Sequence, residues 1–254
     1  MLSKKEKERY LRQIAIDRIG ESGQEKLKES SVLVIGAGGL GSPILMYIVS
    51  AGVGQVGIVD GDFVSLSNLA RQILYTSDDI GKKKVLIAKN RLNAMNPDVK
   101  IEIYPEFLNE KNARGIFEKY SCIVDATDNF KTRYLINKTA VELNKPLFVG
   151  AVGRFTGQVV DIMPDVTPCY NCIFPEKDEE ILQKLTERNR RNGVFTPLVG
   201  IIGTLVANEV LKFLLQIGEN FFGKLLVYDA LTNDFSVIPV KKDPDCKICG
   251  LSNR

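Results

Sequence analysis

The chain has 254 residues, of which 44% are hydrophobic and 26% charged, which suits one α/β domain and excludes a disordered chain, collagen and a coiled-coil rod. Its net charge of +3, from 34 basic and 31 acidic side chains, is too balanced to indicate general nucleic-acid binding. The sequence has no histidine, which excludes an imidazole base, a Ser-His-Asp triad and a histidine-rich metal site.

Buried strands alternate with helices over the first 150 residues, which predicts a doubly wound, mostly parallel sheet of the Rossmann-like α/β class. Before the first strand, the charged segment 6–19 is typical of an amphipathic helix, and 24–29 of a second short one. The predicted strands are 31–35, 56–59, 100–104, 122–124 and 146–149. The predicted helices between them are 42–51, 82–95, 112–119 and 130–143.

The alternation changes after the fifth strand. Further strands, which suggest an antiparallel extension of the sheet, are predicted at 157–163, 224–228 and 235–240. The dense charges of 176–192 are typical of a mobile surface segment that is partly helical. The apolar stretch 196–216 contains Asn208, Glu209 and Lys212, so we expect a buried core helix there rather than a membrane span.

The first residues are charged and lack the apolar core of a signal peptide. Together with the interrupted apolar stretch, this predicts a cytoplasmic protein without a membrane partner. In that compartment the five cysteines are expected to be metal ligands or reduced thiols rather than disulfides.

The first predicted strand is followed by a turn with the spacing G-x-G-x-x-G, formed by Gly36, Gly38, Gly39 and Gly41. Glycines at these positions let the backbone approach phosphates, whose charge the N-terminus of the next helix favours. Asp60 ends the next strand, where an acidic residue can hold a ribose hydroxyl. These features predict nucleotide binding, but they do not separate NAD from ATP.

Polar side chains near further strand ends favour a magnesium–triphosphate over a nicotinamide. The segment 60–72 carries acids, an amide and an arginine. The segment 81–85 places lysines at a helix start, where they oppose the helix dipole unless an anion meets them. The segment 125–129 supplies two carboxylates after a buried strand. Ligands of open α/β sheets bind at the carboxyl ends of the strands, where carboxylate, lysine and arginine together suit Mg-ATP.

The cysteines form two C-x-x-C pairs far apart in the chain, Cys169 with Cys172 and Cys246 with Cys249. Four thiolates can close a tetrahedral structural zinc site that has no open coordination position. A shared zinc ion would tie the C-terminal tail to the middle of the fold. The alternative is a pair of separate redox motifs. Cys122 lies in an apolar strand and is expected to be a core residue.

In combination these motifs resemble the MoeB/ThiF/HesA family, the bacterial and archaeal relatives of ubiquitin-activating enzymes. The matching segments run from the N-terminal helix to the tail: 9–13, 36–41, 65–72, 81–85, 125–129, 167–175 and 245–250. The resemblance implies an enzyme that uses Mg-ATP to adenylate the C-terminal glycine carboxylate of a ubiquitin-fold sulfur carrier (MoaD- or ThiS-like, ending in Gly-Gly), with release of pyrophosphate.

The resemblance also implies one adenylation domain over 1–254, with N-terminal helices in 1–30, a nucleotide-binding core in 31–150 and a carrier-binding and zinc-binding half in 151–254. The catalytic residues that it implies are Arg12, Arg71, Lys84 and Asp128. The implied cofactor-binding residues are Gly36, Gly38, Gly39, Gly41, Asp60, Ser67, Asn68, Arg71, Lys84, Asp128 and Asn129, with Asp128 as the magnesium ligand. Arg12 resembles an arginine that reaches into the partner subunit's site, which implies a homodimer.

Asn189 occupies a position where many members of that family carry a cysteine, which argues against a covalent thioester step. No sulfur-transfer domain follows within the sequence, so we expect a separate sulfurtransferase to supply sulfur. The pathway, thiamine or molybdopterin synthesis, stays open at this point. The alternatives are adenylation of another peptide or protein carboxylate, a non-enzymatic nucleotide-binding scaffold, and an NAD-dependent oxidoreductase, which only the glycine motif and Asp60 support.

Overall fold

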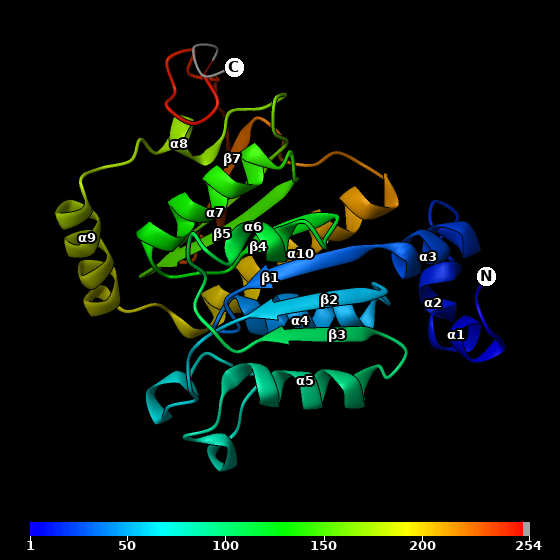
Figure 1. Cartoon of the computed structure of the whole chain (residues 1–254). Coiled ribbons are helices and arrows are strands. Elements are labelled where there is room, and N and C mark those ends of the chain that lie inside the picture. The colour runs from blue at the N-terminus through cyan, green and yellow to red at the C-terminus, as the bar shows by residue number, and fades with distance from the viewer. Residues whose placement is uncertain (251–254) are drawn as a thin grey trace.

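The computed structural model describes residues 1–250 and, within them, every side chain except that of Arg190. An eight-stranded sheet with the order β3-β2-β1-β4-β5-β6-β7-β8 runs through these residues (Figure 1). Its strands are β1 (Ser31–Ile35), β2 (Gln55–Val59), β3 (Lys100–Tyr104), β4 (Cys122–Asp125), β5 (Leu147–Gly153), β6 (Thr156–Ile162), β7 (Lys224–Asp229) and β8 (Asp234–Pro239). Neighbours from β3 to β5 pair in parallel, and β5 to β8 pair antiparallel. The predicted mostly parallel sheet with an antiparallel extension is confirmed.

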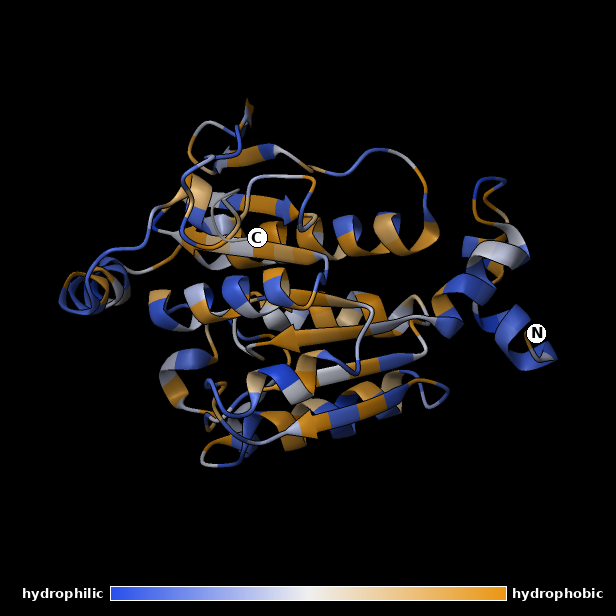
Figure 2. Cartoon of the chain, turned by 45° about the horizontal axis from the view of Figure 1, so that its top comes forward, coloured by the Kyte–Doolittle hydropathy of each residue, from blue (hydrophilic) through white to orange (hydrophobic). Residues whose placement is uncertain are grey.

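Helices cover both faces of this sheet. They are α1 (Lys4–Arg9), α2 (Leu11–Ile14), α3 (Gly20–Glu29), α4 (Gly41–Ser50), α5 (Lys84–Met95), α6 (Ala113–Phe117), α7 (Phe130–Glu142), α8 (Tyr170–Ile173), α9 (Glu179–Asn192) and α10 (Thr196–Leu215), with short 3-10 turns at Leu66–Asn68 and Ser77–Asp79. Side chains of α4, α5 and α10 share one hydrophobic core, and those of α6 and α7 share a second. Figure 2 shows the apolar residues concentrated in the strands and inner helices, with hydrophilic residues dominating α9 and the N-terminal helices.

The strand order explains where a ligand can bind. β1 pairs with β2 on one side and with β4 on the other. After β1 the chain therefore adds β2 and β3 on one side of it, and then adds β4 and β5 on the other side. The loops that follow β1 and β4 diverge at this reversal and leave a crevice at the carboxyl ends of the strands.

The long apolar helix α10 has the length and composition to cross a membrane, yet it packs inside the molecule. It lies against α4, β5 and β6, and Leu198, Ile202 and Val206 are fully buried. Gly203 lets it approach α4 closely, because a Cβ atom there would lie 2.8 Å from the Leu40 carbonyl oxygen. The predicted core helix is confirmed.

One expected helix differs in the structure, and one charged segment folds as expected. The single helix expected over 6–19 is wrong, because α1 ends at Arg9 and a separate short α2 follows. The chain turns there to bury Tyr10, whose hydroxyl accepts a hydrogen bond from Asn96 Nδ2 at 2.8 Å. The segment 176–192 is partly helical as expected, since the 14-residue helix α9 occupies 179–192. Contacts with α7 stabilise it: Leu182 is buried, and Lys131 pairs with Glu179 at 2.5 Å.

The two C-x-x-C pairs come together beside α7. Their four sulfur atoms all lie within 4.8 Å of one another, and three of the Sγ–Sγ distances are 3.4, 3.7 and 4.0 Å. These separations are too long for a disulfide, which needs about 2 Å. They fit a tetrahedron of sulfurs at about 2.3 Å from a zinc ion. The side-chain amides of Asn137 and Asn171 donate to Cys169 and Cys246 at 3.6 and 3.4 Å, as outer partners of metal ligands do.

A buried pair of acids joins β6 to α10. Asp161 and Glu209 are each 1% exposed, and both accept a hydrogen bond from the Phe221 N–H, at 2.9 and 3.3 Å. Glu209 also pairs with Lys212 at 2.7 Å and accepts from Asn220 at 3.0 Å. Burial and the neighbouring charge of Glu209 raise the pKa of Asp161 well above its ordinary value. Folding therefore favours the neutral form of the Asp161 carboxyl.

Replacing Asp161 by Asn is expected to stabilise the protein at about pH 8 and to change little near pH 4. Because folding raises the pKa of this acid, the stability that it contributes is complete below the ordinary pKa of 3.8 and falls as the pH rises toward the folded value. The amide still accepts from Phe221 without a charge, so we expect a gain of order 1 kcal/mol. Urea unfolding at both pH values measures it, and a lower midpoint for Asp161→Asn at about pH 8 would contradict the assignment.

The cysteine cluster is expected to hold about one zinc ion per chain. Cys249→Ser should lose the zinc and lower the melting temperature by at least about 5 °C, because the metal ties the tail to the fold. Elemental analysis and thermal unfolding measure the two effects. Cys122→Ala, which removes a buried cysteine outside the cluster, is the matched control and should keep its zinc. A zinc-free preparation with an unchanged melting temperature and four titratable thiols would contradict this prediction.

Candidate active site

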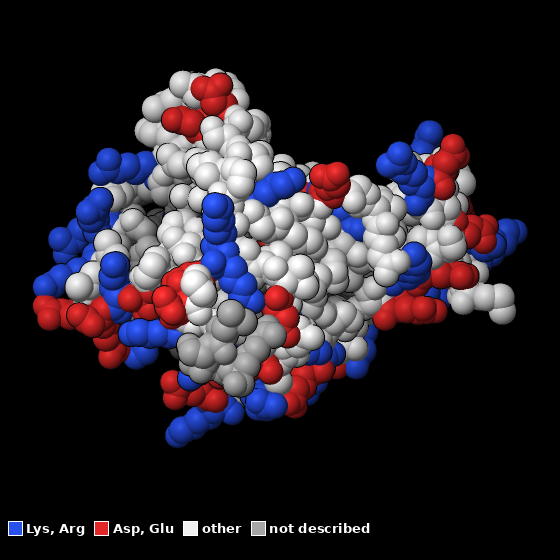
Figure 3. Space-filling model, turned by 90° about the horizontal axis from the view of Figure 1, so that it is seen from above, with Lys and Arg blue, Asp and Glu red and all other residues white. Residues whose placement is uncertain are grey.

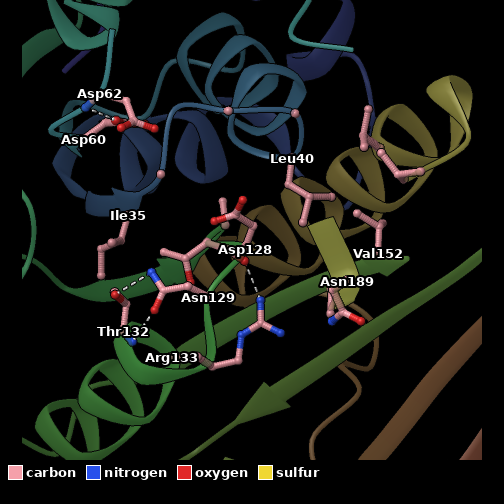
Figure 4. Close-up of a pocket in the computed structure, with 18 of the residues that line it drawn as sticks. Ile35, Leu40, Asp60, Asp62, Asp128, Asn129, Thr132, Arg133, Val152 and Asn189 are labelled. Carbon is pink, nitrogen blue, oxygen red and sulfur yellow. Dashed lines mark hydrogen bonds between the residues drawn. The ribbon is translucent and has the colours of Figure 1, made fainter. Parts of the chain in front are cut away.

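A cavity of about 1030 Å³ opens at the carboxyl ends of the parallel strands, where the strand order reverses. Its size matches the upper range of ligand pockets, roughly 300–1000 Å³. The predicted site residues that line it are Gly36, Gly38, Gly39, Asp60, Asn68, Arg71, Lys84, Asp128 and Asn129. Segments far apart in the sequence therefore contribute to one site, part of which Figure 4 shows.

The glycine turn forms one wall of the cavity. Gly36 has φ of +96°, in the region that favours glycine, and a Cβ atom there would lie 2.7 Å from the Ala126 carbonyl oxygen. Gly41 does not line the cavity, because it starts α4 against the same turn. A Cβ atom on Gly41 would lie 2.0 Å from the Gly36 oxygen. The turn thus needs glycine at both ends, and it directs the N-terminus of α4 toward the cavity, as phosphate sites do.

Asp60 fixes the glycine turn to the loop after β2. Its carboxylate accepts hydrogen bonds from the backbone N–H groups of Ala37 and Asp62, both at 2.8 Å. Burial raises the pKa of Asp60, although the positive charge of Lys84 opposes this. The residue predicted to hold a ribose hydroxyl therefore also holds the protein's own backbone.

Two cations face the cavity from the region after β2. Lys84 is the first residue of α5 and is only 4% exposed, with its Nζ 3.1 Å from the Asp62 carboxylate. Arg71 is half-buried and donates to the Ser67 carbonyl oxygen at 3.1 Å. Asp62 offsets the unfavourable position of a lysine at a helix start. A bound polyphosphate would meet both cations.

The loop after β4 supplies one carboxylate to the cavity, although its sequence has two. Asp125 is fully buried and pairs with Arg133 at 3.0 Å. Asp128 is exposed and lines the cavity, so it is the carboxylate that can reach a magnesium ion. Asn129 caps α7, since its Oδ1 accepts from the Thr132 N–H at 2.8 Å. Figure 4 shows Asp128 and Asn129 on the wall opposite Asp60 and Asp62.

Two other predicted residues lie outside the cavity. Ser67 lies in the Leu66–Asn68 turn but is not part of the lining. Arg12 lies on α2 and is exposed. Figure 1 shows the N-terminal helices at the opposite end of the molecule from α9, whose Asn189 does line the cavity. Within one protomer, Arg12 is therefore remote from this site.

Sequence reasoning missed two buried polar residues of the lining, Arg133 and Gln72. No local pattern distinguishes Arg133, because its partners are distant in the chain. Gln72 lies in the 65–72 segment that matches the family, which is the signal that could have found it. Its Oε1 atom is buried and has no hydrogen-bond partner among the described residues. Such an acceptor is suited to a donor on a ligand.

Charges of both signs surround the α9 side of the cavity. On α9, Lys184 pairs with Glu180 at 2.5 Å. Figure 3, a view from above, shows basic and acidic side chains interspersed at that end and again over the N-terminal helices, with a largely uncharged surface between them. Among the described residues, this face is not uniformly basic.

Comparisons with known proteins agree with the fold. Residues 10–248 match the ThiF family. The "Sulfur carrier protein adenylyltransferase" of Thermus thermophilus is 46% identical over 98% of this chain and 92% of its own length. The "Adenylyltransferase and sulfurtransferase MOCS3" of Caenorhabditis briggsae is 41% identical over 98% of this chain and 62% of its own length. The crystal structure of E. coli MccB with succinimide has a TM-score of 0.79 at 25% identity, covering 89% of this chain and 68% of that one. The chain belongs to the ThiF family.

Proposed function

We propose that this protein is an adenylyltransferase that uses Mg-ATP to activate the C-terminal glycine carboxylate of a ubiquitin-fold sulfur carrier. The observation that carries the proposal is the meeting of Arg71, Lys84 and Asp128, from three segments, in one cavity beside the glycine turn. A nicotinamide cofactor would leave these charges without a role. The name of the Thermus thermophilus relative supports the carrier as substrate. A carrier from either thiamine or molybdopterin synthesis fits this chemistry.

The reaction brings two anions together, because a carboxylate must attack the α-phosphorus of ATP. Arg71 and Lys84 would neutralise the phosphates and the charge that develops on the leaving pyrophosphate. Asp128 would hold the magnesium ion, which when bound stabilises charge on the phosphate oxygens. The attacking carboxylate is already ionised at neutral pH, so an enzyme without histidine needs no general base.

We propose that the product is the carrier adenylate and that a separate sulfurtransferase then attacks it. Cys122 is fully buried, and burial raises its pKa to about 12. The other four cysteines form the metal cluster, and no cysteine is among the described residues that line the cavity. Asn189 and Gly193 line the cavity, so the tail of the carrier would enter beneath α9. The Caenorhabditis briggsae relative is named for both activities in a longer chain.

The active unit in this proposal is a homodimer of single-domain chains. Arg12 can reach a triphosphate only in the site of a second copy, because it lies far from its own cavity. Its exposed neighbours Leu11 and Ile16, and Leu66 and Ile73 near the cavity, are large apolar side chains of the kind that interfaces cover. We place the dimer in the cytoplasm, where the reduced thiols of the cluster would persist.

Lys84→Ala and Asp128→Ala should each lower the carrier-dependent exchange of labelled pyrophosphate into ATP by about 10²–10³-fold, because each removes charge stabilisation from the transition state. The matched control is Lys82→Ala, an exposed lysine two positions away that does not line the cavity. It should exchange at nearly the wild-type rate. Near-normal exchange by either site variant would remove that residue from the mechanism, and absence of exchange in the wild type would refute the proposed reaction.

Mixing inactive Arg12→Ala chains with inactive Lys84→Ala chains should restore activity. Random exchange of subunits makes half of the dimers mixed, and each mixed dimer holds one site with both groups intact, so about a quarter of the wild-type rate is expected. The same pyrophosphate exchange measures it, after mass spectrometry has verified subunit exchange. If no activity returns despite exchanged subunits, Arg12 does not act across the interface.

A further inference from the structure

The cysteine cluster lies next to the cavity, and one residue belongs to both. Tyr170 lies between Cys169 and Cys172 in the chain, and it also lines the cavity. Its backbone N–H donates to Asn137 Oδ1 at 2.8 Å, while Asn137 Nδ2 donates to Cys169 Sγ at 3.6 Å. The turn that carries the first cysteine pair therefore sets the position of the Tyr170 ring.

The Tyr170 ring lies over the guanidinium group of Arg133. The Arg133 Cζ atom is 5.6 Å from the ring centroid, and the two residues are only 4% and 6% exposed. Burial alone would lower the pKa of Arg133, but Asp125 and Tyr170 raise it above its ordinary value, so the cation persists. A desolvated cation is attracted to the face of an aromatic ring, so this contact can hold the guanidinium in place.

Arg133 in turn holds the loop that carries Asp128. Its Nε pairs with Asp125 at 3.0 Å, and its Nη2 donates to the Thr127 and Gly150 carbonyl oxygens at 2.7 and 3.0 Å. Figure 4 shows Arg133 directed at this loop, with Asp128 beside it. One guanidinium group thus links β5 to the loop after β4. The bond in that loop is to Thr127, the residue that precedes Asp128.

We propose that the metal cluster positions the magnesium-binding carboxylate of the cavity through Tyr170 and Arg133. α7 makes the link rigid, because Arg133 and Asn137 lie one turn apart on the same face of this helix. Loss of the metal releases the 169–172 turn, then the ring, then the guanidinium and the Thr127 carbonyl. Tyr170 and Arg133 are positioning residues in this scheme. The inference rests on the proposed function, since it requires the cavity to bind a divalent cation with ATP.

A double-mutant cycle tests the link. Binding of Mn²⁺–ATP to the full chain is measured by the electron paramagnetic resonance of free Mn²⁺, with zinc in place and after its removal by a chelator that is then separated from the protein. Zinc removal is expected to weaken binding by about tenfold in the wild type, the usual effect of losing an outer-shell partner. Tyr170→Leu should show a similar loss with zinc in place, and zinc removal should then add little. Additive effects of the two changes would overturn the inference.

Zinc-loaded variants test the link even if the stripped chain unfolds, which circular dichroism would show. Tyr170→Leu should weaken Mn²⁺–ATP binding while it keeps its zinc, and Tyr170→Phe, which preserves the ring, should restore binding. Tyr134→Leu is the matched control, because Tyr134 is a buried ring 5.6 Å from Tyr170 that does not line the cavity. Equal losses in the two leucine variants would overturn the inference alone. A wild type that binds no Mn²⁺–ATP would overturn the proposed function and the inference with it.

Discussion

Parallel pairing of β1 with strands on both sides is the constraint on which the site depends. It brings the carboxyl ends of β2, β1 and β4 to one edge of the sheet, and an acidic side chain at the end of β2 and of β4 then fixes the loops there. Asp60 at β2 accepts from the glycine turn. Asp125 at β4 accepts from Thr127 and pairs with Arg133. The side chains that line the cavity are thus mounted on backbone that these acidic side chains hold in place.

Strands and inner helices could be predicted closely from the sequence because their buried apolar residues recur with the spacing typical of a strand or of a helix. The predicted strands 31–35 and 100–104 have the bounds of β1 and β3. Unbroken apolar runs read as strands covered on both faces, and Asn96-Pro97 ends a helix through backbone geometry alone. The cluster of four cysteines could also be predicted from the sequence, because two pairs of cysteines at C-x-x-C spacing are typical of a structural zinc site.

The remaining features depend on contacts between distant residues. Nothing near Arg133 in the sequence indicates that it will meet Asp125, Gly150 and Tyr170, so its place in the site could not be predicted. The break after α1 has the same origin, because the burial of Tyr10 against Asn96 outweighs a continuous helical pattern. The dense charges of 176–192 indicated a segment that is only partly helical. Contacts with α7, together with the ion pair between Lys184 and Glu180 one turn apart, stabilise the 14-residue helix α9.

The order of the cysteines in the chain determines when the metal site can form during synthesis. The glycine turn and strands β1 to β6 precede Cys169, whereas Cys246 follows Cys169 by 77 residues. A nascent chain can therefore fold its glycine turn and its parallel strands long before the tetrahedron of sulfurs can close. Metal uptake is a late event that a prematurely terminated chain cannot reach. A metal ion held by all four sulfurs therefore indicates a chain that has been made at least through Cys249.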